Sequence, residues 1–343
     1  MRIAFICPFD IHQLTGTPIR ASAVIKAASL GEPLVISDQE NIGAFRFTLR
    51  ALSQLSKYKP DIIHAFTTLS VVPAFLYKIF FLSKVKIVFE MHGWSWFETR
   101  GNTNLLKRIV FLSLDRFGFA FAHRVIAMSH SQKRFLEKIS KRKKIEVMWG
   151  PASSEIIYMK PIERAEFIAG YLGNMSFWQG LPIVLDAAKI LLNDKHIRFE
   201  LAGFKPAGQN LPELSNVKYL GKIPALEVAA TLKCFDVLLS PRLESEVSNL
   251  QYPQKLSEYI AAGRPIIATD ISDQRKVIEE GGCGIVIKDM DGQKLADALR
   301  RISSLSYEER ERMGKRAVSF AKEHVSFEVF SKNLLKIYQD LGF

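Results

Sequence analysis

Twelve short apolar runs alternate with longer segments along the whole chain, and several of these segments have helical periodicity. The runs are rich in β-branched residues and apolar throughout, rather than apolar at every second position. A strand of this kind must be covered on both faces, which favours parallel sheets with helices on either side. The predicted strands span residues 2–7, 33–37, 61–66, 85–90, 124–128, 145–148, 168–173, 197–203, 217–221, 235–240, 265–269 and 284–287.

The pattern restarts once, which indicates two domains in series. After the sixth run comes an irregular stretch and then a fresh run, so we place the boundary near residue 155. The 343 residues suit two domains of roughly 150–180 residues each. We expect an α/β fold with two Rossmann-like, doubly wound parallel-sheet domains facing across a cleft, at 1–155 and 156–320. The strandless segment 321–343 is expected to form a helix that crosses back to the first domain.

The excess positive charge lies entirely in the first domain. Residues 1–150 carry 22 Lys and Arg against 10 Asp and Glu, whereas residues 151–343 carry 25 of each. Such a field should attract an anionic partner, whether lipid headgroups, a phosphorylated acceptor or nucleic acid.

The remaining composition points to an ordinary globular protein. Its three cysteines are scattered without metal-ligand spacing, so we expect buried thiols in a reducing compartment. The most apolar stretch, 71–89, contains three lysines and lacks the roughly 20 uninterrupted apolar residues of a membrane span, which predicts burial inside the domain. The opening MRIAFICPFD is typical of a first strand and its turn rather than of a secretory signal.

Ligands of parallel sheets bind beyond the carboxyl ends of the strands, which directs attention to the loops that follow. In the first domain, Gly16 and Thr17 lead into a helix whose free N–H groups could bind a phosphate. His92 follows the fourth strand, with Trp94 and Trp96 close behind, and aromatic faces suit sugar rings. A plain helix start and a structural histidine are the alternative readings.

The loop after the first strand of the second domain offers neutral polar groups. Gly173 and Gly180 bracket it, and Asn174 and Gln179 lie between them. A simple turn between strand and helix would explain each of these residues singly.

The most informative stretch is SPRLESEVSNLQYPQKLSEYIAAGRPIIATD. Pro253 suits a helix start, which places Lys255 in the first turn, where a cation is unfavourable unless an anion occupies the helix end. Arg242, just after the preceding strand, could bind the same anion. Glu258 lies one turn on and could accept from both hydroxyls of a ribose. A surface Lys–Glu pair would explain two of these charges, but neither Pro253 nor Arg242.

These motifs resemble the GT-B glycosyltransferases, specifically the retaining family 4 group. The block from SPR to PIIATD is similar to the SPR…P-x-K-x-x-E-Y signature of one large subgroup. The GN…QGL loop, the His-Gly pair and the early Gly-Thr-Pro fall in the matching places, and the resemblance covers the whole chain. It implies an acceptor-side first domain and a second domain that binds a nucleotide sugar.

The resemblance implies roles for individual residues. Arg242 and Lys255 would bind the donor diphosphate and, with His92 near the transferred carbon, form the catalytic set. Glu258 would hold the ribose. The other donor-binding positions are Gly16, Thr17, Gly173, Asn174, Gln179, Asn249, Pro253 and Leu256, and the acceptor-binding positions are Trp94 and Trp96.

The sequence departs from the family pattern at two places. Many members have Arg and Lys where this chain has Asn174 and Gln179, so Arg242 and Lys255 would carry more of the charge. The first of two family glutamates is Leu250 here, which puts the sugar identity in doubt. The groups left to meet the sugar hydroxyls are Glu244, Glu246 or the backbone near Asn249.

The resemblance implies a retaining transfer of a hexose-type sugar from a nucleotide-diphosphate sugar. We expect no metal and no cofactor. One alternative is a GT-B sugar-nucleotide epimerase or hydrolase, and another is a non-catalytic nucleotide-binding member. A dehydrogenase is disfavoured because no Gly-x-Gly-x-x-Gly follows the first strand of either domain.

The acceptor is expected to be an anionic or lipid-linked glycan or a polysaccharide precursor. The basic first half predicts peripheral contact with the inner face of the cytoplasmic membrane and a cytoplasmic location. Nucleic acid is not expected as a partner.

Overall fold

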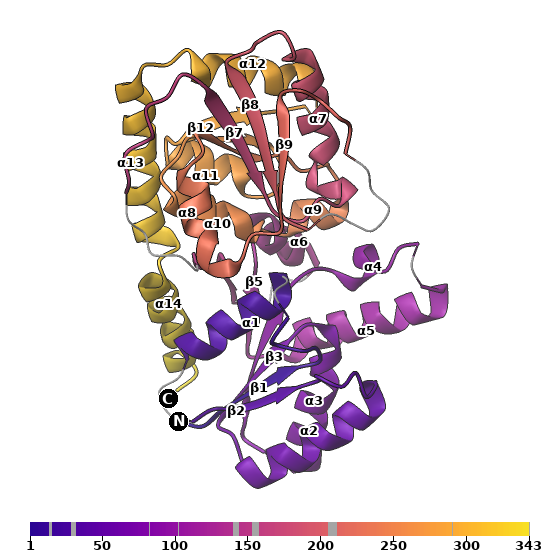
Figure 1. Ribbon diagram of the computed structural model, residues 1–343. Coiled ribbons are helices and arrows are strands. Elements are labelled where there is room, and N and C mark those ends of the chain that lie inside the picture. Colours follow the sequence, from indigo (N-terminus) through magenta and orange to yellow (C-terminus); the bar gives the residue numbers. More distant parts are fainter. Residues whose placement is uncertain are drawn as a thin grey trace. The chain divides into compact units, whose positions relative to one another are not determined.

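The computed structural model contains two parallel six-stranded sheets, each flanked by helices (Figure 1). It describes residues 1–13, 16–28, 32–81, 83–101, 103–139, 144–152, 158–204, 211–289 and 291–342. The chain divides into unit 1, Met1–Pro151 with Phe327–Phe343, and unit 2, Ala152–Ser326. The predicted boundary at residue 155 lies outside the described residues. The predicted α/β architecture with two parallel-sheet domains is confirmed.

Unit 1 is built on a sheet with the strand order β2-β1-β3-β4-β5-β6. Each predicted strand of the first half is present, with ends shifted by at most one residue. The strands are β1 Ile3–Cys7, β2 Leu34–Ser37, β3 Ile62–Phe66, β4 Lys86–Met91, β5 Arg124–Ala127 and β6 Ile145–Val147.

Helices cover both faces of this sheet. Helices α1 and α14 pack together over the face that carries Phe66 and Val88, and α14 thereby joins the C-terminal segment to unit 1. Because successive strand residues alternate between faces, Phe89 lies on the opposite face, where Gly118 allows α5 to approach closely. The helices are α1 Gly16–Ala27, η1 Thr68–Ser70, α2 Ala44–Tyr58, α3 Val71–Phe80, α4 Ser95–Glu98, α5 Leu105–Phe121, α6 His130–Ile139 and α14 Phe327–Gln339.

Unit 2 repeats the plan with the strand order β12-β11-β10-β7-β8-β9. Its strands are β7 Phe167–Leu172, β8 Ile197–Ala202, β9 Val217–Gly221, β10 Val237–Ser240, β11 Ile266–Thr269 and β12 Gly284–Ile287. Its helices are η2 Phe177–Gln179, α7 Leu181–Ile190, η3 Ala225–Glu227, α8 Val228–Lys233, α9 Glu246–Leu250, α10 Gln254–Ala261, α11 Gln274–Glu280, α12 Gly292–Ser303 and α13 Tyr307–His324.

Glycines allow the loops at the carboxyl edge of this second sheet to meet. A Cβ atom on Gly203, after β8, would lie 1.9 Å from the carbonyl oxygen of Gly173, after β7. A Cβ atom on Gly180 would lie 2.3 Å from the carbonyl oxygen of Pro241, after β10. Both glycines have positive φ angles, +129° and +81°, that other residues rarely adopt. The carboxyl ends of three strands are thus drawn into one cluster.

Two predictions about burial are wrong in part. The stretch 71–89 forms α3 and most of β4, and about half of its described residues are buried, but Ile79, Phe80 and Phe81 are 58%, 68% and 51% exposed. These three residues come after Tyr77, the last buried residue of α3. Cys7 and Cys283 are buried, whereas Cys234 is exposed. Within the described part of the chain, no helix is long and apolar enough to cross a membrane.

Candidate functional site

Unit 2 places two cations at the carboxyl edge of its sheet. Arg242 follows Pro241 at the end of β10, and its side chain is only 1% exposed. Lys255 is the second residue of α10, two residues after the N-cap residue Pro253, and so lies in the first turn as predicted. The residue as a whole is half-buried, but its Nζ atom is buried.

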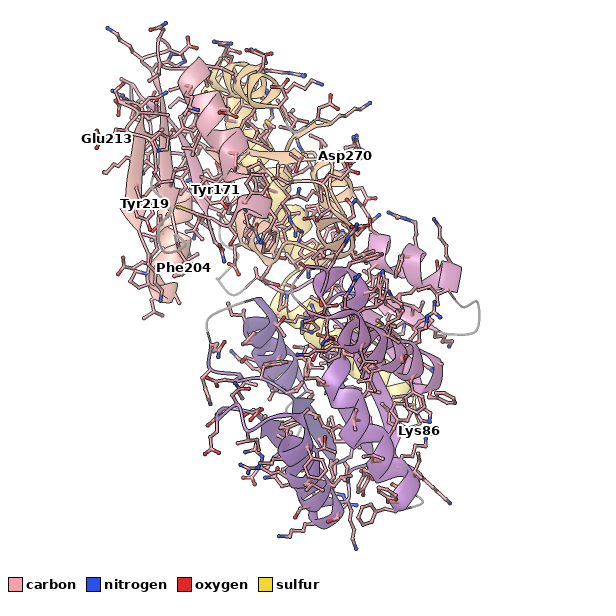
Figure 2. The ribbon with its side chains drawn as sticks, turned by 90° about the vertical axis from the view of Figure 1, so that its right-hand side faces the viewer. Lys86, Tyr171, Phe204, Glu213, Tyr219 and Asp270 are labelled. Atoms are coloured by element: carbon pink, nitrogen blue, oxygen red, sulfur yellow. The ribbon has the colours of Figure 1, made fainter. Side chains whose placement is uncertain are left out.

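The charge of Lys255 is not compensated within the structure. Its Nζ has no hydrogen-bond partner among the described residues and lies 4.3 Å from the ring centroid of Tyr171. Tyr171 belongs to β7 and is labelled in Figure 2. Its Cδ lies 3.6 Å from the position that a Cβ on Gly173 would take. The ammonium group therefore lies over the loop that follows β7, in contact with an aromatic face.

Arg242 is held rigidly but is also incompletely bonded. Its backbone N–H donates to Thr269 Oγ1 at 2.8 Å, and its Nη1 donates to the carbonyl oxygen of Gln251 at 2.9 Å. Its Nε, which is buried, has no partner among the described residues. The guanidinium carbon lies 5.6 Å from the ring of Trp178.

The pKa values of the two groups reflect this environment. Burial, followed by the charge of Arg242, lowers the pKa of Lys255 to about 7. Burial lowers the pKa of Arg242 to about 10, an effect that Tyr171 partly opposes. Two neighbouring cations with unsatisfied donors are costly to hold in apolar surroundings. They are well suited to bind a multivalent anion, which would remove that cost.

The predicted polar residues of the loop after β7 serve the loop itself. Gly173 lies beside Lys255 with φ +147°, as expected for a position of close approach. The Asn174 side chain accepts from the backbone N–H and the hydroxyl of Ser176, at 2.8 and 2.6 Å, and so forms a local turn. Gln179 ends the short helix η2 and is half-buried.

The other predicted donor-binding residues of unit 2 differ in what they can offer. Glu258 is 9% exposed and lies one helical turn after Lys255. Asn249 lies in α9, beside Leu250, whose side chain is 7% exposed and belongs to the core. The side chain of Leu256 is fully buried, and its N–H donates to the Pro253 carbonyl oxygen at 2.9 Å.

Unit 1 brings together two of its predicted residues. Thr17 lies at the start of α1, and His92 lies after β4, and the distance between Thr17 Oγ1 and His92 Nδ1 is 3.1 Å. The other ring nitrogen, Nε2, lies 2.8 Å from Oε1 of Glu90. Gly16 is exposed at the helix start, with open space around it.

Glu90 is the centre of a charged network that the sequence analysis missed. The carboxylate is completely buried and lies 3.1 Å from Arg20 Nε, itself 1% exposed. Its second oxygen lies 3.4 Å from His64 Nε2, and the other nitrogen of His64 is 2.8 Å from the hydroxyl of Tyr338 in α14. The network extends from the C-terminal helix to His92.

The charges within this network are set by burial and by pairing. Burial alone would raise the pKa of Glu90, but Arg20, His64 and His92 together hold it well below its usual range. Burial lowers the pKa of His64, and the hydrogen bond to Glu90 and its negative charge only partly oppose this lowering. Because the ionised carboxylate can only accept, we infer that His92 carries its proton on Nε2. Its Nδ1 is then an acceptor for a hydroxyl, from Thr17 or from a sugar, and Glu90 is a positioning residue.

Glu90→Gln is expected to change the tautomer of His92, because the amide can donate to Nε2 and move the proton to Nδ1. Ring ¹⁵N chemical shifts of labelled protein measure the tautomer directly. The control is Thr17→Val, which removes the partner of Nδ1 and should leave Nε2 protonated. Wild-type protein with the proton on Nδ1 would contradict the assignment.

The predicted acceptor role of Trp94 is not supported by its position. Trp94 is 4% exposed and packs edge-on against Phe135 at 5.3 Å, so neither of its faces is open to a sugar. Trp96 is half-buried, and the guanidinium of Arg108 lies 4.1 Å from its ring. One face of Trp96 is therefore occupied by Arg108.

A second buried carboxylate fixes the loop that contains Trp94. Asp115 of α5 accepts from Thr68 Oγ1 at 2.6 Å and from the backbone N–H of Ser95 at 2.8 Å. Burial raises the pKa of Asp115 to about 6. These contacts hold the start of α4 three residues after His92.

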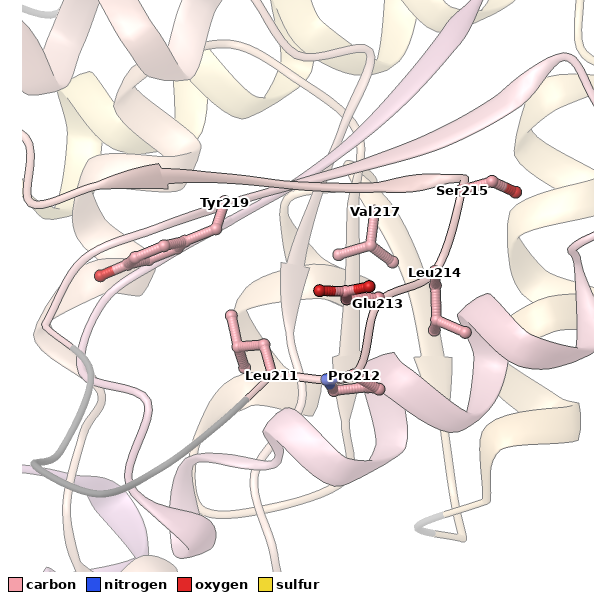
Figure 3. A pocket seen from close by; sticks show the side chains of 7 residues that line it. All are labelled: Leu211, Pro212, Glu213, Leu214, Ser215, Val217 and Tyr219. Atoms are coloured by element: carbon pink, nitrogen blue, oxygen red, sulfur yellow. The ribbon is translucent and has the colours of Figure 1, made fainter.

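A pocket beside the edge strand β9 is chemically different from the cation site (Figure 3). Its volume is about 390 Å³, and Glu213 contributes the only charged side chain among the residues that line it. Its lining is mostly apolar, which does not suit a diphosphate. No group of three or more His, Cys, Asp or Glu residues that could hold a metal ion occurs within the residues described.

Both halves of the chain match known sequence families. Residues 11–151 match a family described as Glycosyltransferase Family 4, and residues 166–304 match Glycosyl transferases group 1. Spore coat protein SA of Bacillus subtilis is 30% identical over 186 residues, which cover 49% of this chain and 48% of that protein. D-inositol 3-phosphate glycosyltransferase of Corynebacterium urealyticum is 27% identical over 190 residues, covering 51% and 43%. The match thus spans about half the length of these curated relatives.

Solved structures share the fold over nearly the whole chain. Sucrose-phosphate synthase of Thermosynechococcus elongatus superposes with a TM-score of 0.80 at 15% identity, covering 99% of this chain and 98% of that one. HepE of Anabaena, solved in complex with UDP-glucose, gives a TM-score of 0.74 at 16% identity and covers 99% and 100%. Glycosyltransferase family models thus match both halves of the chain, and its two-sheet architecture is the GT-B fold.

Proposed function

We propose that the chain transfers a sugar from a nucleoside diphosphate sugar to an acceptor, with Lys255 and Arg242 binding the diphosphate. One observation carries this proposal: a buried ammonium group without a hydrogen-bond partner lies beside a second buried cation at the carboxyl edge of a parallel sheet. This edge is where ligands of such sheets bind. The likeness to structures solved with a nucleotide sugar supports the same reading.

The cations would act on the leaving group. As the bond between the anomeric carbon and the phosphate oxygen breaks, the diphosphate departs with the electron pair and its negative charge grows. Lys255 and Arg242 stabilise that charge with donors already in place. The acceptor hydroxyl forms the new glycosidic bond from the same face and gives its proton to the departing phosphate oxygen. The anomeric configuration is retained, and the two cations take the role that a metal ion fills elsewhere.

Other residues would orient the donor and the acceptor. Glu258 accepts hydrogen bonds from the ribose, and the resemblance makes Thr17 and His92 candidates for contact with a sugar. HepE of Anabaena was solved with UDP-glucose, which makes UDP-hexoses the first donors to test. The positive charge of the first 150 residues favours an anionic acceptor, such as a lipid-linked glycan carrying phosphate.

A thermal-shift panel of UDP-, GDP- and ADP-sugars tests donor binding. A ligand at 100 times its dissociation constant adds about 2.7 kcal/mol to stability. We expect one nucleoside series to raise Tm in wild-type protein but not in Lys255→Ala. A panel without any shift would contradict the proposal.

Product analysis of the stabilising donor, with and without acceptor, separates the candidate reactions. Transfer requires acceptor, whereas an epimerase or hydrolase consumes donor alone. A protein that binds the donor without turnover under both conditions would be a non-catalytic member.

A further inference from the structure

His123 of unit 1 is held beside strand β4 by two hydrogen bonds. It lies between α5 and β5, and its backbone N–H donates to the carbonyl oxygen of Ile87 at 2.8 Å. In return, the backbone N–H of Ile87 donates to Nδ1 of the His123 ring at 2.9 Å. A ring nitrogen that accepts a hydrogen bond carries no proton, so the proton of this neutral imidazole is on Nε2.

The Nε2 atom of His123 faces the amine of Lys78. Lys78 lies in the last turn of α3, and its Nζ is 3.0 Å from this ring nitrogen. The amine also donates to the carbonyl oxygen of Val85 at 3.3 Å. Because Nε2 carries a proton it can only donate, and an ammonium group has no lone pair with which to accept. The contact is therefore a hydrogen bond only when Lys78 is a neutral amine.

The surroundings of Lys78 also favour the neutral amine. Burial and, after it, the charge of Lys86 lower the pKa of Lys78. Lys86 is the first residue of β4, so a cation and the His123 ring are the titratable groups next to this amine. Among the residues that the structure describes, no Asp or Glu forms an ion pair with Lys78 that would favour its charged form.

We propose that Lys78 is a nucleophilic lysine that takes up acyl groups from acyl phosphates or thioesters. The amine lone pair attacks the carbonyl carbon and an amide bond forms, while the bond from that carbon to the phosphate oxygen or to the sulfur breaks. The phosphate or thiolate leaves with the electron pair, and the proton that the amine loses passes to it or to water. The Lys78 side chain is half-buried, so small reagents can reach it from solvent.

The amide product can use the same hydrogen-bond partners. Its carbonyl oxygen can accept from His123 Nε2 in place of the amine lone pair, and its N–H can donate to the Val85 oxygen. Acylation of an amine that is already neutral removes no charge, so Tm should change little. The site lies at the amino end of β4 in unit 1, and its chemistry does not depend on the proposed transfer reaction.

Acetylation of the full chain across pH 7–9, followed by mass spectrometry of its peptides, tests the proposal. The probes are acetyl phosphate and, in a parallel series, acetyl-coenzyme A. At pH 7 a lysine with the usual pKa of about 10.4 is neutral in only about one molecule in 10³, and its rate rises about tenfold per pH unit. At pH 7 we expect Lys78 to react about tenfold or more faster than Lys84, which is exposed, and to depend much less on pH. Reaction with only one probe supports the site and identifies the acyl source.

Two variants test the cause of this reactivity. His123→Phe removes the N–H that requires a neutral amine, so Lys78 should react more slowly at pH 7 and its rate should rise steeply with pH. Lys86→Gln removes the neighbouring cation and should act in the same direction but less strongly, because burial lowers the pKa of Lys78 more than Lys86 does. If His123→Phe does not fold, the comparison of Lys78 with Lys84 in wild-type protein decides alone.

Three results would overturn the proposal. The first is an equal rate for Lys78 and Lys84 at pH 7, with the same rise toward pH 9. The second is the absence of acetylation at Lys78 with both probes. The third is a folded His123→Phe variant in which Lys78 keeps the wild-type rate and pH dependence, because the histidine contact would then not control the amine.

Discussion

Lys255→Met is expected to make the protein more stable while removing its activity. Met matches the length of the Lys side chain and needs neither a partner nor solvation at this buried position. The charged Lys255 is held next to Arg242 with its Nζ unpartnered and its pKa lowered to about 7 by burial and by Arg242. Because a pKa difference of one corresponds to about 1.4 kcal/mol, the gain should be on the order of a few kcal/mol.

The stability that Lys255→Met gains over the wild-type protein should decrease as pH rises. In the unfolded chain lysine titrates near a pKa of about 10.4, so between pH 7 and that value the unfolded state binds more protons than the folded state. The stability of the wild-type protein should therefore rise with pH across this range, and Lys255→Met should lack this dependence. The difference in Tm between the two proteins should be largest below pH 7 and should narrow toward pH 10. A wild-type protein more stable than Lys255→Met at pH 6 would contradict the assignment.

The same variant should lose transfer activity by about 10²–10³, the effect of removing one preorganised donor from a transition state. Gln254→Ala, one residue earlier in α10, is the matched control for the helix start. A variant more stable than wild type and nearly inactive would show that the buried cation serves function rather than folding.

Arg264→Met is expected to destabilise the protein strongly, and much more than the loss of a surface arginine of unit 2. Arg264 is 1% exposed and follows Gly263. Gly263 has a φ angle of +68° and lies in the turn between α10 and β11. Its guanidinium group donates to five backbone carbonyl oxygens, those of Met159, Lys160, Lys233, Phe235 and Gly263. These carbonyls belong to segments far apart in the chain, so one side chain joins the β10 and β11 regions to the start of the unit.

Removal of this group would leave several carbonyl oxygens without their donor. We expect a loss on the order of 3–5 kcal/mol in the free energy of unfolding, measured in urea. Arg275→Met is the matched control, because Arg275 is exposed on α11 and pairs with Asp270 and Glu279 at the surface. A surface pair of this kind contributes about 1 kcal/mol or less. Equal losses in the two variants would contradict the structural role of Arg264.

The fold could be predicted from the sequence because its strands are apolar on both faces. Such runs leave few alternatives to parallel sheets covered by helices, and the restart after residue 148 divides them between two sheets. The placement of Lys255 was predictable for a local reason, because Pro253 fixes the start of α10 two residues before it. Arg242 and Lys255 could be predicted to lie close together, because both come after β10 and so lie at the carboxyl edge of the same sheet.

The network around Glu90 could not be predicted, because its members are far apart in the sequence. Arg20, His64 and Tyr338 come from α1, β3 and α14, and no local spacing relates them to β4. The one available signal was an acidic residue within the apolar strand VKIVFEM. The burial of Trp94 depended on which side of its segment packs inward. Neither helix periodicity nor composition decides this when both sides carry apolar residues.

Proton uptake during ligand binding is the sharpest test of whether Lys255 and Arg242 bind a diphosphate. At about pH 8, a group with a pKa near 7 is mostly neutral, and a bound anion would restore its proton. Calorimetric titration with pyrophosphate, UDP and GDP in two buffers of different ionisation enthalpy measures the number of protons taken up. We predict uptake approaching one proton per bound ligand in wild-type protein, and weaker binding without uptake in Lys255→Met. Binding of equal strength in both proteins, with no proton taken up by either, would contradict the account.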